Sequence, residues 1–270
     1  MTKKNRTFFA HLRIFYYFCT LKRSNMEDFF SRSEALLGAE AMSRLAETRV
    51  ILFGVGGVGS WCAEALIRTG LRHLTIVDDD TVQPSNLNRQ LPATRDTLGR
   101  PKVEALRERL LSINPDAEII ALNERYTSLS TLNSPLSTYD VVVDAIDSVN
   151  DKADLLIEAT KAGCRVYSSM GAALRFDPTH VRVSSFDRVS GDGLARALRQ
   201  RFKRLGQYPV HSIRCVWSDE PPREVQRDNV QGTKANSQPP IANSQTKGSL
   251  MPVTATFGCT LASLLIRDLQ

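Results

Sequence analysis

Short apolar runs alternate with stretches of helical periodicity along most of this chain. Six runs are too short for helices and rich in β-branched residues, which predicts strands over 49–53, 73–77, 117–122, 140–147, 165–168 and 180–185. Between the first five, apolar residues at helical spacing predict helices over 60–70, 103–113 and 152–163. Strands and helices that alternate at this spacing predict an α/β fold, a Rossmann-like, doubly wound, mostly parallel sheet.

The flanking segments have different patterns. Residues 27–48 are amphipathic and helical with a break at Gly38, whereas 79–102 are polar and rich in turn formers, which predicts irregular structure. After about residue 187 an apolar helical stripe is followed by a polar stretch over 218–249, rich in Pro, Ser, Asn and Gln. Residues 252–266 return to a core-like composition. We therefore expect one domain over 26–270, in which 187–250 is a substrate-side crossover segment and the C-terminal segment packs back on the core.

Residues 1–25 combine a basic run with an apolar one. They resemble the start of a signal peptide, but His11 and Arg13 interrupt the apolar run and no small-residue cleavage site follows. The run is also too short to span a bilayer. We expect an extension outside the fold, with Met26 as an alternative start, in a cytoplasmic protein. A membrane-surface anchor is the alternative.

Charge and cysteine content limit the function classes. The net charge of +6 comes from the six basic residues of 1–25, because without them 29 basic residues face 29 acidic ones. Overall charge therefore gives no evidence for nucleic-acid binding by the body of the chain, and we expect no DNA partner. The five cysteines include no CxxC pair, so neither a zinc site nor a disulfide framework is predicted, and a reducing compartment fits best.

A glycine-rich turn joins the first predicted strand to the first helix of the alternating pattern. Gly54, Gly56, Gly57 and Gly59 let the backbone approach a phosphate closely, and the helix start offers free N–H groups to the anion. Asp78 ends the next strand about twenty residues later, where such folds place a carboxylate on ribose hydroxyls. This stretch predicts a nucleotide site.

Three further charged residues extend the prediction. Arg89 and Lys102 follow in a loop opposite the glycine turn, and Asp147 ends another strand that faces the same crevice. Two cations beside a triphosphate and a carboxylate that can hold Mg²⁺ suit adenylyl transfer from ATP. Taken singly, each is more simply interpreted as a surface charge in a loop. A nicotinamide enzyme would account for Gly54 to Asp78 but has no need of the residues that follow.

The motifs GVGGVG, DDDTVQPSNLNRQ, GRPK and DAID together resemble the ThiF/MoeB/HesA family, relatives of ubiquitin-activating enzymes. The resemblance covers about 30–186 and recurs at 253–266. It implies that Gly57 lies at the phosphates, Asp78 at the ribose, Lys102 at the phosphates and Asp147 at Mg²⁺. It also implies that Ser85, Asn86 and Arg89 contact the nucleotide. Arg32 matches an arginine that reaches the ATP of a partner subunit, which implies a homodimer.

Within that family the chain is similar to the tRNA threonylcarbamoyladenosine dehydratases, through RSEALLG, DAIDSVNDK, the basic helix and MPVTATFG. This resemblance implies ATP-dependent cyclisation of N6-threonylcarbamoyladenosine beside the anticodon, through an acyl-adenylate. Ring closure is intramolecular and demands no catalytic cysteine, although Cys215, expected in a loop, matches a cysteine of some relatives. Two alternatives stay open: an adenylyltransferase for a sulfur-carrier or ubiquitin-like protein, and a scaffold that only binds nucleotide. A cysteine desulfurase or sulfur-acceptor system is a further candidate partner.

A basic helix is the candidate tRNA contact. Leu194, Leu198, Phe202 and Leu205 form an apolar stripe that would hold the helix on the body. The cations between them would then face outward toward phosphates: Arg196, Arg199, Arg201, Lys203 and Arg204. A solvated basic helix without a ligand is the alternative.

Overall fold

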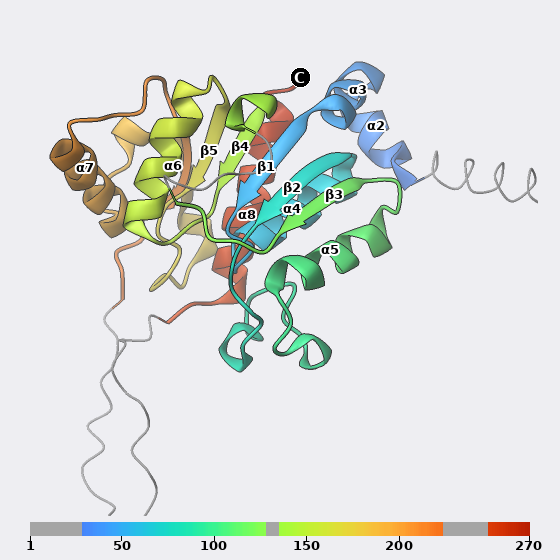
Figure 1. Ribbon diagram of the computed structural model, residues 1–270, viewed down its shortest axis with the longest axis horizontal. Helices are drawn as coiled ribbons and strands as arrows, with labels where there is room; N and C mark the ends of the chain where they lie inside the picture. Colours follow the sequence, from blue (N-terminus) through green and yellow to red (C-terminus); the bar gives the residue numbers. More distant parts are fainter. Residues whose placement is uncertain (1–28, 128–134, 224–247) are drawn as a thin grey trace, which may run out of the picture.

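We describe residues 29–127, 135–223 and 248–270 of a computed structural model, which form a seven-stranded sheet covered by helices (Figure 1). The strand order is β3-β2-β1-β4-β5-β7-β6, and all neighbours are parallel except β6, which runs antiparallel to β7. The strands are β1 (Arg49–Phe53), β2 (His73–Val77), β3 (Glu118–Leu122), β4 (Val141–Asp144), β5 (Arg165–Ser169), β6 (Val181–Ser185) and β7 (Arg214–Ser218). The predicted α/β class with a mostly parallel sheet is confirmed.

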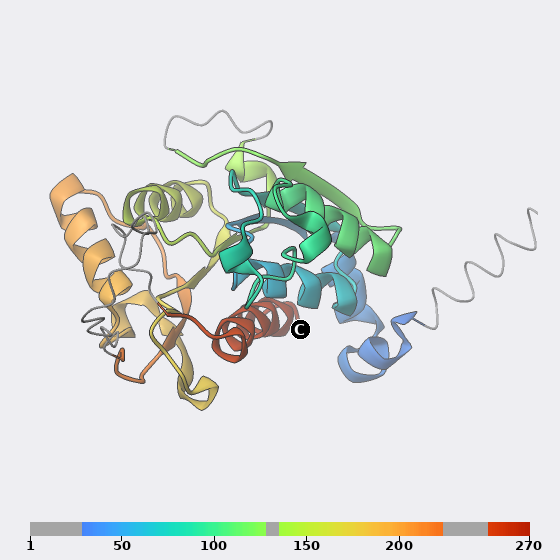
Figure 2. The same ribbon diagram turned by 90° about the horizontal axis from the view of Figure 1, so that it is seen from below.

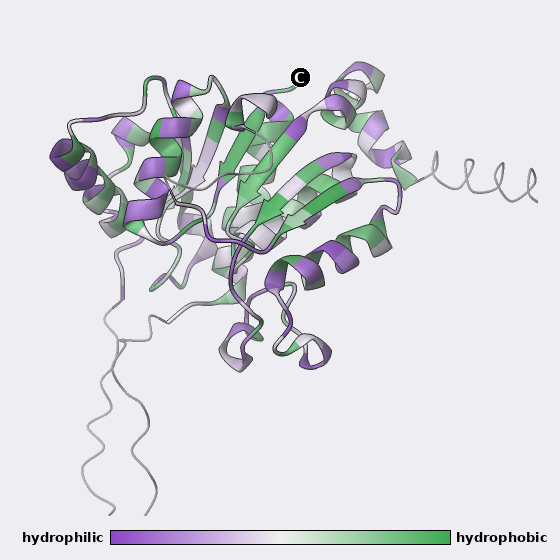
Figure 3. Cartoon of the chain, in the orientation of Figure 1, coloured by the Kyte–Doolittle hydropathy of each residue, from purple (hydrophilic) through white to green (hydrophobic). Residues whose placement is uncertain are grey.

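Helices cover both faces of the sheet. They are α2 (Ser31–Leu37), α3 (Ala39–Glu47), α4 (Gly59–Thr69), α5 (Lys102–Ile113), α6 (Val149–Lys161), α7 (Gly193–Leu205) and α8 (Met251–Arg267). Side chains of β1 alternate between two cores: Val50 and Leu52 pack with α4, α5 and α8, whereas Ile51 and Phe53 pack with α6 and α7. Figure 2 shows α8, in red, beside α4, and Figure 3 shows apolar strands between helices with polar outer surfaces.

The strand order reverses between β1 and β4. β1 pairs with β2 on one side, Phe53 opposite Val77, and with β4 on the other, Phe53 opposite Asp144. In such sheets the carboxyl ends of the strands on either side of the reversal form a ligand crevice. The loop over 79–101 projects from this edge, whereas α2 and α3 lie toward the opposite edge (Figure 1). The fold therefore brings together the glycine turn after β1, the acids after β2 and the loop after β4.

Most predicted elements are confirmed, including the break at Gly38 and the return of the C-terminal segment as α8. Two predictions about the strands are wrong. β4 ends at Asp144, because the Asp144 carboxylate accepts a hydrogen bond from the Ile146 N–H, 3.1 Å, which turns the chain, so Asp147 lies in a loop. β7 was not predicted, and it places Cys215 in a strand of the sheet.

The predicted extension at 1–25 and most of the polar stretch at 218–249 lie outside the described residues. Among the helices that are described, none combines the length and apolar character needed to cross a membrane.

Candidate functional site

The glycine turn between β1 and α4 offers unpaired backbone donors. Gly54 has a φ of +86°, and a side chain there would place its Cβ atom 2.7 Å from the Ala145 carbonyl oxygen. A Cβ atom at Gly59 would overlap the Gly54 carbonyl oxygen. Within the described part of the chain, the N–H groups of Gly57 and Val58 have no hydrogen-bond acceptor. Free N–H groups at the start of a helix of 11 residues form a site for an anion such as phosphate.

Asp78, the residue after β2, stabilises this turn through hydrogen bonds. Its Oδ2 accepts a hydrogen bond from the Val55 N–H, 2.7 Å, and its Oδ1 accepts one from the Asp80 N–H, 2.9 Å. Burial raises the pKa of Asp78 above its ordinary value, and the Lys102 charge and these hydrogen bonds offset only part of that effect. Both oxygens keep lone pairs for a further donor, such as a ribose hydroxyl.

Lys102 is the first residue of α5, not part of a loop as the sequence suggested. Its side chain is only 6% exposed, and its Nζ lies 2.6 Å from Oδ2 of Asp80, whose side chain is 67% exposed. Asp80, which sequence reasoning did not single out, therefore holds the buried ammonium in place, close enough to Asp78 for its charge to affect the pKa of Asp78. Asp78, Asp79 and Asp80 also bring three carboxylate oxygens within 4.8 Å of one another, although exposed acids often cluster without an ion.

Arg89 lies against the glycine turn. A Cβ atom at Gly57 would come within 3.3 Å of Cγ of Arg89, and the Trp61 indole N–H donates to the Arg89 carbonyl oxygen, 3.0 Å. The guanidinium donates to the Ser85 carbonyl oxygen, 3.0 Å, and to Oδ1 of Asn88, 2.8 Å. The hydrogen bond from Trp61 on α4 thus places a half-buried cation beside the free N–H groups. Neither Trp61 nor Asn88 was predicted as part of the site.

Ser85 and Asn86 shape the loop that carries Arg89. They belong to a short 3-10 helix (Pro84–Asn86), which Asn86 closes by accepting the Gln83 N–H at Oδ1, 2.9 Å. Gln90, also missed by sequence reasoning, is 8% exposed and borders the turn, with its amide nitrogen 3.6 Å from the Cβ position of Gly56. Its amide oxygen has no hydrogen-bond partner among the residues described.

Asp147 is exposed on the loop after β4, and a buried ion pair supports that loop. Nζ of Lys152 lies 2.6 Å from Oδ2 of Asp144, and both side chains are fully buried. The same Nζ donates to the Ile146 carbonyl oxygen, 3.0 Å, next to Asp147. The Ser168 hydroxyl donates to Asp144, 2.6 Å. A buried pair with all of these partners fixes the chain on either side of Asp147.

Arg32 is the one predicted site residue on a helix at the opposite edge of the sheet. α2 has no buried residue, and the neighbouring Phe30 ring lies 3.7 Å from the Cβ position of Gly70, at the far end of α4. At about 1.5 Å per residue, the 11 residues of α4 put about 16 Å between Gly70 and the glycine turn. Arg32 therefore does not reach the crevice of its own chain.

The cations of the basic helix α7 differ in exposure. Leu198 and Phe202 are buried as predicted, and Arg196, Lys203 and Arg204 are exposed. Arg199, however, donates to the carbonyl oxygens of Phe186, 2.9 Å, and Val189, 2.6 Å, so the expectation that it faces outward is wrong. Arg201 is half-buried, 3.9 Å from Asp154. Three of the five cations are thus available to a partner, and α7 is predominantly polar in Figure 3.

Cys215 is fully buried in β7. Burial raises the pKa of Cys215 to about 12, and the Lys152 charge lowers it only in part. The thiol is therefore protonated at neutral pH and is a poor nucleophile.

Comparisons with known proteins show what this chain is similar to. A model of the ThiF family matches residues 30–270. The tRNA threonylcarbamoyladenosine dehydratase of Bacillus subtilis (strain 168) is 34% identical over 237 residues, which cover 88% of this chain and 91% of the relative. The crystal structure of the Escherichia coli enzyme of that name in complex with ATP superimposes with a TM-score of 0.75 at 29% identity, covering 90% of this chain and 94% of that one. The molybdopterin-synthase adenylyltransferase of Salmonella typhimurium is 35% identical, but over 51% of this chain.

Proposed function

This chain belongs to the ThiF family, and from that premise we propose that it is an ATP-dependent tRNA threonylcarbamoyladenosine dehydratase. The observation that carries the proposal is the likeness, over nearly the whole length of both chains, to relatives of that name, one of which has been crystallised with ATP. The crevice supplies the matching chemistry, with free N–H groups, two cations and carboxylates around one glycine turn.

In the proposed reaction the triphosphate of ATP lies on the N–H groups of Gly57 and Val58, and the ribose hydroxyls donate to Asp78. A carboxylate oxygen of the threonyl group attacks the α-phosphorus, which forms an acyl-adenylate and releases pyrophosphate. Arg89 and Lys102 stabilise the charge that develops on the phosphates, an effect that preorganised cations exert strongly in a partly dry site. The carbamoyl group then attacks the activated carbonyl, loses a proton, closes the ring and displaces AMP.

Asp147 is the proposed magnesium ligand. It is exposed and offers carboxylate oxygens, and Lys152 holds its loop through a hydrogen bond to the Ile146 carbonyl oxygen. These properties fit Mg²⁺, which prefers oxygen ligands and keeps several waters. When bound, the ion supplies positive charge that neutralises the phosphate oxygens.

The proposed homodimer explains the position of Arg32. Since α2 buries none of its own residues and exposes 83% of Leu36, it is suited to contact a second copy of the chain. In such a dimer Arg32 would reach the ATP of the partner subunit. Exposed Arg196, Lys203 and Arg204 of α7 are the proposed contacts to tRNA phosphates.

We expect Arg32→Ala and Asp147→Ala each to inactivate the chain, and a mixture of the two proteins to regain part of the activity. In a mixed dimer one of the two sites keeps both residues intact. The measurement is AMP formation after mixing, with subunit exchange followed by native mass spectrometry. A mixture of wild type with Arg32→Ala calibrates the dilution effect. Absence of recovery despite proven exchange would show that Arg32 does not act across an interface.

Adenylation of a ubiquitin-like carrier is the second candidate, favoured by the partial likeness to the molybdopterin-synthase adenylyltransferase. One assay separates the two functions. The full chain is incubated with ATP and either tRNA bearing N6-threonylcarbamoyladenosine or a carrier protein with a free Gly-Gly terminus. We expect AMP to form with the tRNA, matched mole for mole by the cyclic nucleoside in mass spectrometry. Pyrophosphate release with the carrier, together with formation of an adenylated carrier and no AMP from the tRNA, would overturn the proposal.

A further inference from the structure

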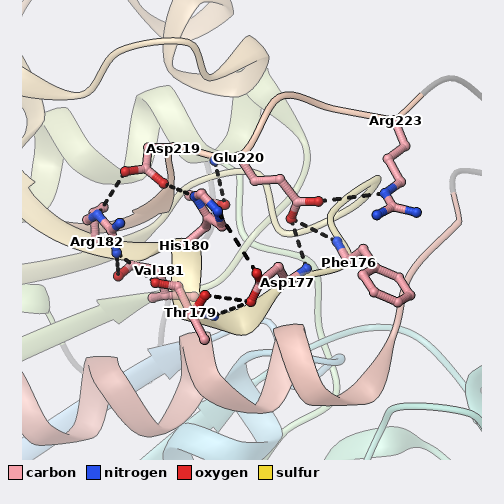
Figure 4. Close-up of polar contacts among 10 residues, drawn as sticks. Phe176, Asp177, Thr179, His180, Val181, Arg182, Asp219, Glu220 and Arg223 are labelled. Carbon is pink, nitrogen blue, oxygen red and sulfur yellow. Dashed lines mark hydrogen bonds and ion pairs between the residues drawn. The ribbon is translucent and has the colours of Figure 1, made fainter.

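Two segments meet at the carboxyl edge of the sheet, beyond β5, β6 and β7 (Figure 4). The N–H groups of Phe176 and Asp177 both donate to Oε2 of Glu220, at 2.9 and 3.0 Å. The Arg223 N–H donates to the Leu174 carbonyl oxygen, 2.9 Å. Although partial burial opposes it, these hydrogen bonds lower the pKa of Glu220, which is therefore charged at neutral pH. Residues 174–177 and 220–223 are thus joined by the Glu220 carboxylate and by one backbone hydrogen bond.

This junction presents an aromatic ring to solvent. Phe176 is 55% exposed, and the guanidinium carbon of Arg223 lies 4.2 Å from the centre of its ring (Figure 4). A single exposed apolar side chain is common and carries no meaning by itself. Here, however, the backbone of the ring is fixed by hydrogen bonds, and a cation whose side chain is 63% exposed lies over it. The pair forms a preorganised flat surface, which we call the Phe176–Arg223 platform.

The platform rests on a buried support. Arg175 is 5% exposed and donates to the Glu220 carbonyl oxygen. Its second guanidinium nitrogen lies 3.9 Å from Asp192, which accepts the Gly171 N–H, 3.0 Å, and caps α7 through the Ala195 N–H, 2.8 Å. The platform is therefore held against the end of β5 and the start of α7, the helix with exposed cations.

A chain of hydrogen bonds joins the platform to the adenylation site. The Leu174 N–H donates to the Gly248 carbonyl oxygen, 2.8 Å. The next residue, Ser249, accepts the side-chain amide of Asn88 at its carbonyl oxygen, 2.9 Å, and Asn88 in turn accepts the Arg89 guanidinium, 2.8 Å. The platform thus lies on the same edge of the sheet as the crevice, connected to it through ordered backbone.

We propose that the Phe176–Arg223 platform stacks an unpaired base of the substrate tRNA, next to the adenosine whose side chain is activated. This inference rests on the proposed function. Bases of single-stranded loops are recognised by stacking on aromatic rings and Arg planes, and the anticodon loop supplies such bases. The stacked neighbour would add affinity for the loop that carries the reacting nucleotide, whereas the cations of α7 contact phosphates.

The test compares Phe176→Ala, Phe176→Trp and the wild type, with Ile120→Ala as the control. Ile120 is 46% exposed on β3, the edge strand at the other end of the strand order from β6. We expect Phe176→Ala to raise the KM for tRNA about 10-fold, the size of one lost base stack, while kcat and the KM for ATP stay unchanged. Phe176→Trp should restore the KM, and Ile120→Ala should have no effect. Because stacking is not a charge contact, the salt dependence of tRNA affinity should stay unchanged in Phe176→Ala, whereas the Arg196→Ala/Lys203→Ala/Arg204→Ala variant should flatten it.

An abasic substrate identifies the occupant. An anticodon stem-loop bearing N6-threonylcarbamoyladenosine is made with an abasic site on its 5′ or 3′ side. With one of these two substrates, the wild type should lose as much affinity as Phe176→Ala loses with the intact stem-loop. Phe176→Ala should bind that abasic substrate as well as it binds the intact one. An unchanged KM for tRNA in Phe176→Ala would contradict the proposal. So would losses of affinity from the abasic site and from Phe176→Ala that are fully additive for both abasic substrates. If the wild type forms no AMP with the intact stem-loop or tRNA, the proposed function itself is wrong.

Discussion

Replacing Lys102 by alanine is expected to lower the rate of AMP formation by about 10²-fold or more, as loss of a preorganised electrostatic stabiliser does. The Lys102 ammonium is almost fully buried and is held in place by its ion pair with Asp80. In the proposed reaction its charge would act on the phosphates with little screening by water, and solvent would not replace it. The measurement is single-turnover AMP formation at saturating ATP and tRNA, so that weakened binding is not mistaken for slower chemistry.

Asp80→Asn is the matched control for this prediction. It keeps the shape of the partner and removes only its charge, and Asp80 is largely exposed, so the fold should tolerate the change. We expect a smaller loss of activity than in Lys102→Ala, because the ammonium stays in place. Near-normal turnover in Lys102→Ala would exclude it from the phosphate site.

The second large effect is on stability. Lys152→Ala is expected to lower the free energy of unfolding by about 3–5 kcal/mol, because it leaves a buried carboxylate without its counter-charge. Asp144 is fully buried, and the hydroxyl of Ser168 and the N–H of Ile146 would be its remaining donors. Denaturant unfolding at neutral pH measures the loss.

The double variant Asp144→Asn/Lys152→Met separates loss of the pair from loss of one partner. Replacing both charges of a buried pair is often far less costly than removing one. We therefore expect the double variant to be more stable than Lys152→Ala. A Lys152→Ala protein as stable as the wild type would contradict the assignment of a fully buried ion pair at this position.

The parts of the molecule that sequence predicts well are those determined locally. β1 and β2 match their predicted bounds. A strand such as Val50 to Phe53 is buried on both faces, so its residues are apolar throughout and the run is recognisable in the sequence. The glycine turn was predicted because Gly54 and Gly59 are demanded by backbone geometry within the same few residues. Asp78 follows at a spacing set by one helix and one strand.

The parts that sequence missed depend on partners far along the chain. Lys152 looks like an ordinary polar residue in the first turn of a helix, and its burial is evident only when Asp144 lies 2.6 Å away. β7 is stabilised by pairing with β5 and β6, which no local pattern reveals. In the sequence, Arg199 and Arg196 are both arginines between the apolar positions of the same helix. Only in the folded chain do the carbonyl groups of Phe186 and Val189 lie beside Arg199.

The packing of α8 on α4 has a consequence for how this protein folds. A Cβ atom at Gly258 of α8 would lie 2.7 Å from Cβ of Trp61 on α4, so two segments near opposite ends of the described chain meet in close contact. Contacts between residues so distant in sequence pay a large loop-closure entropy and form slowly. Trp61 is also the residue that anchors Arg89 beside the glycine turn. During refolding, the competence to bind ATP should therefore appear late, after most of the secondary structure has formed.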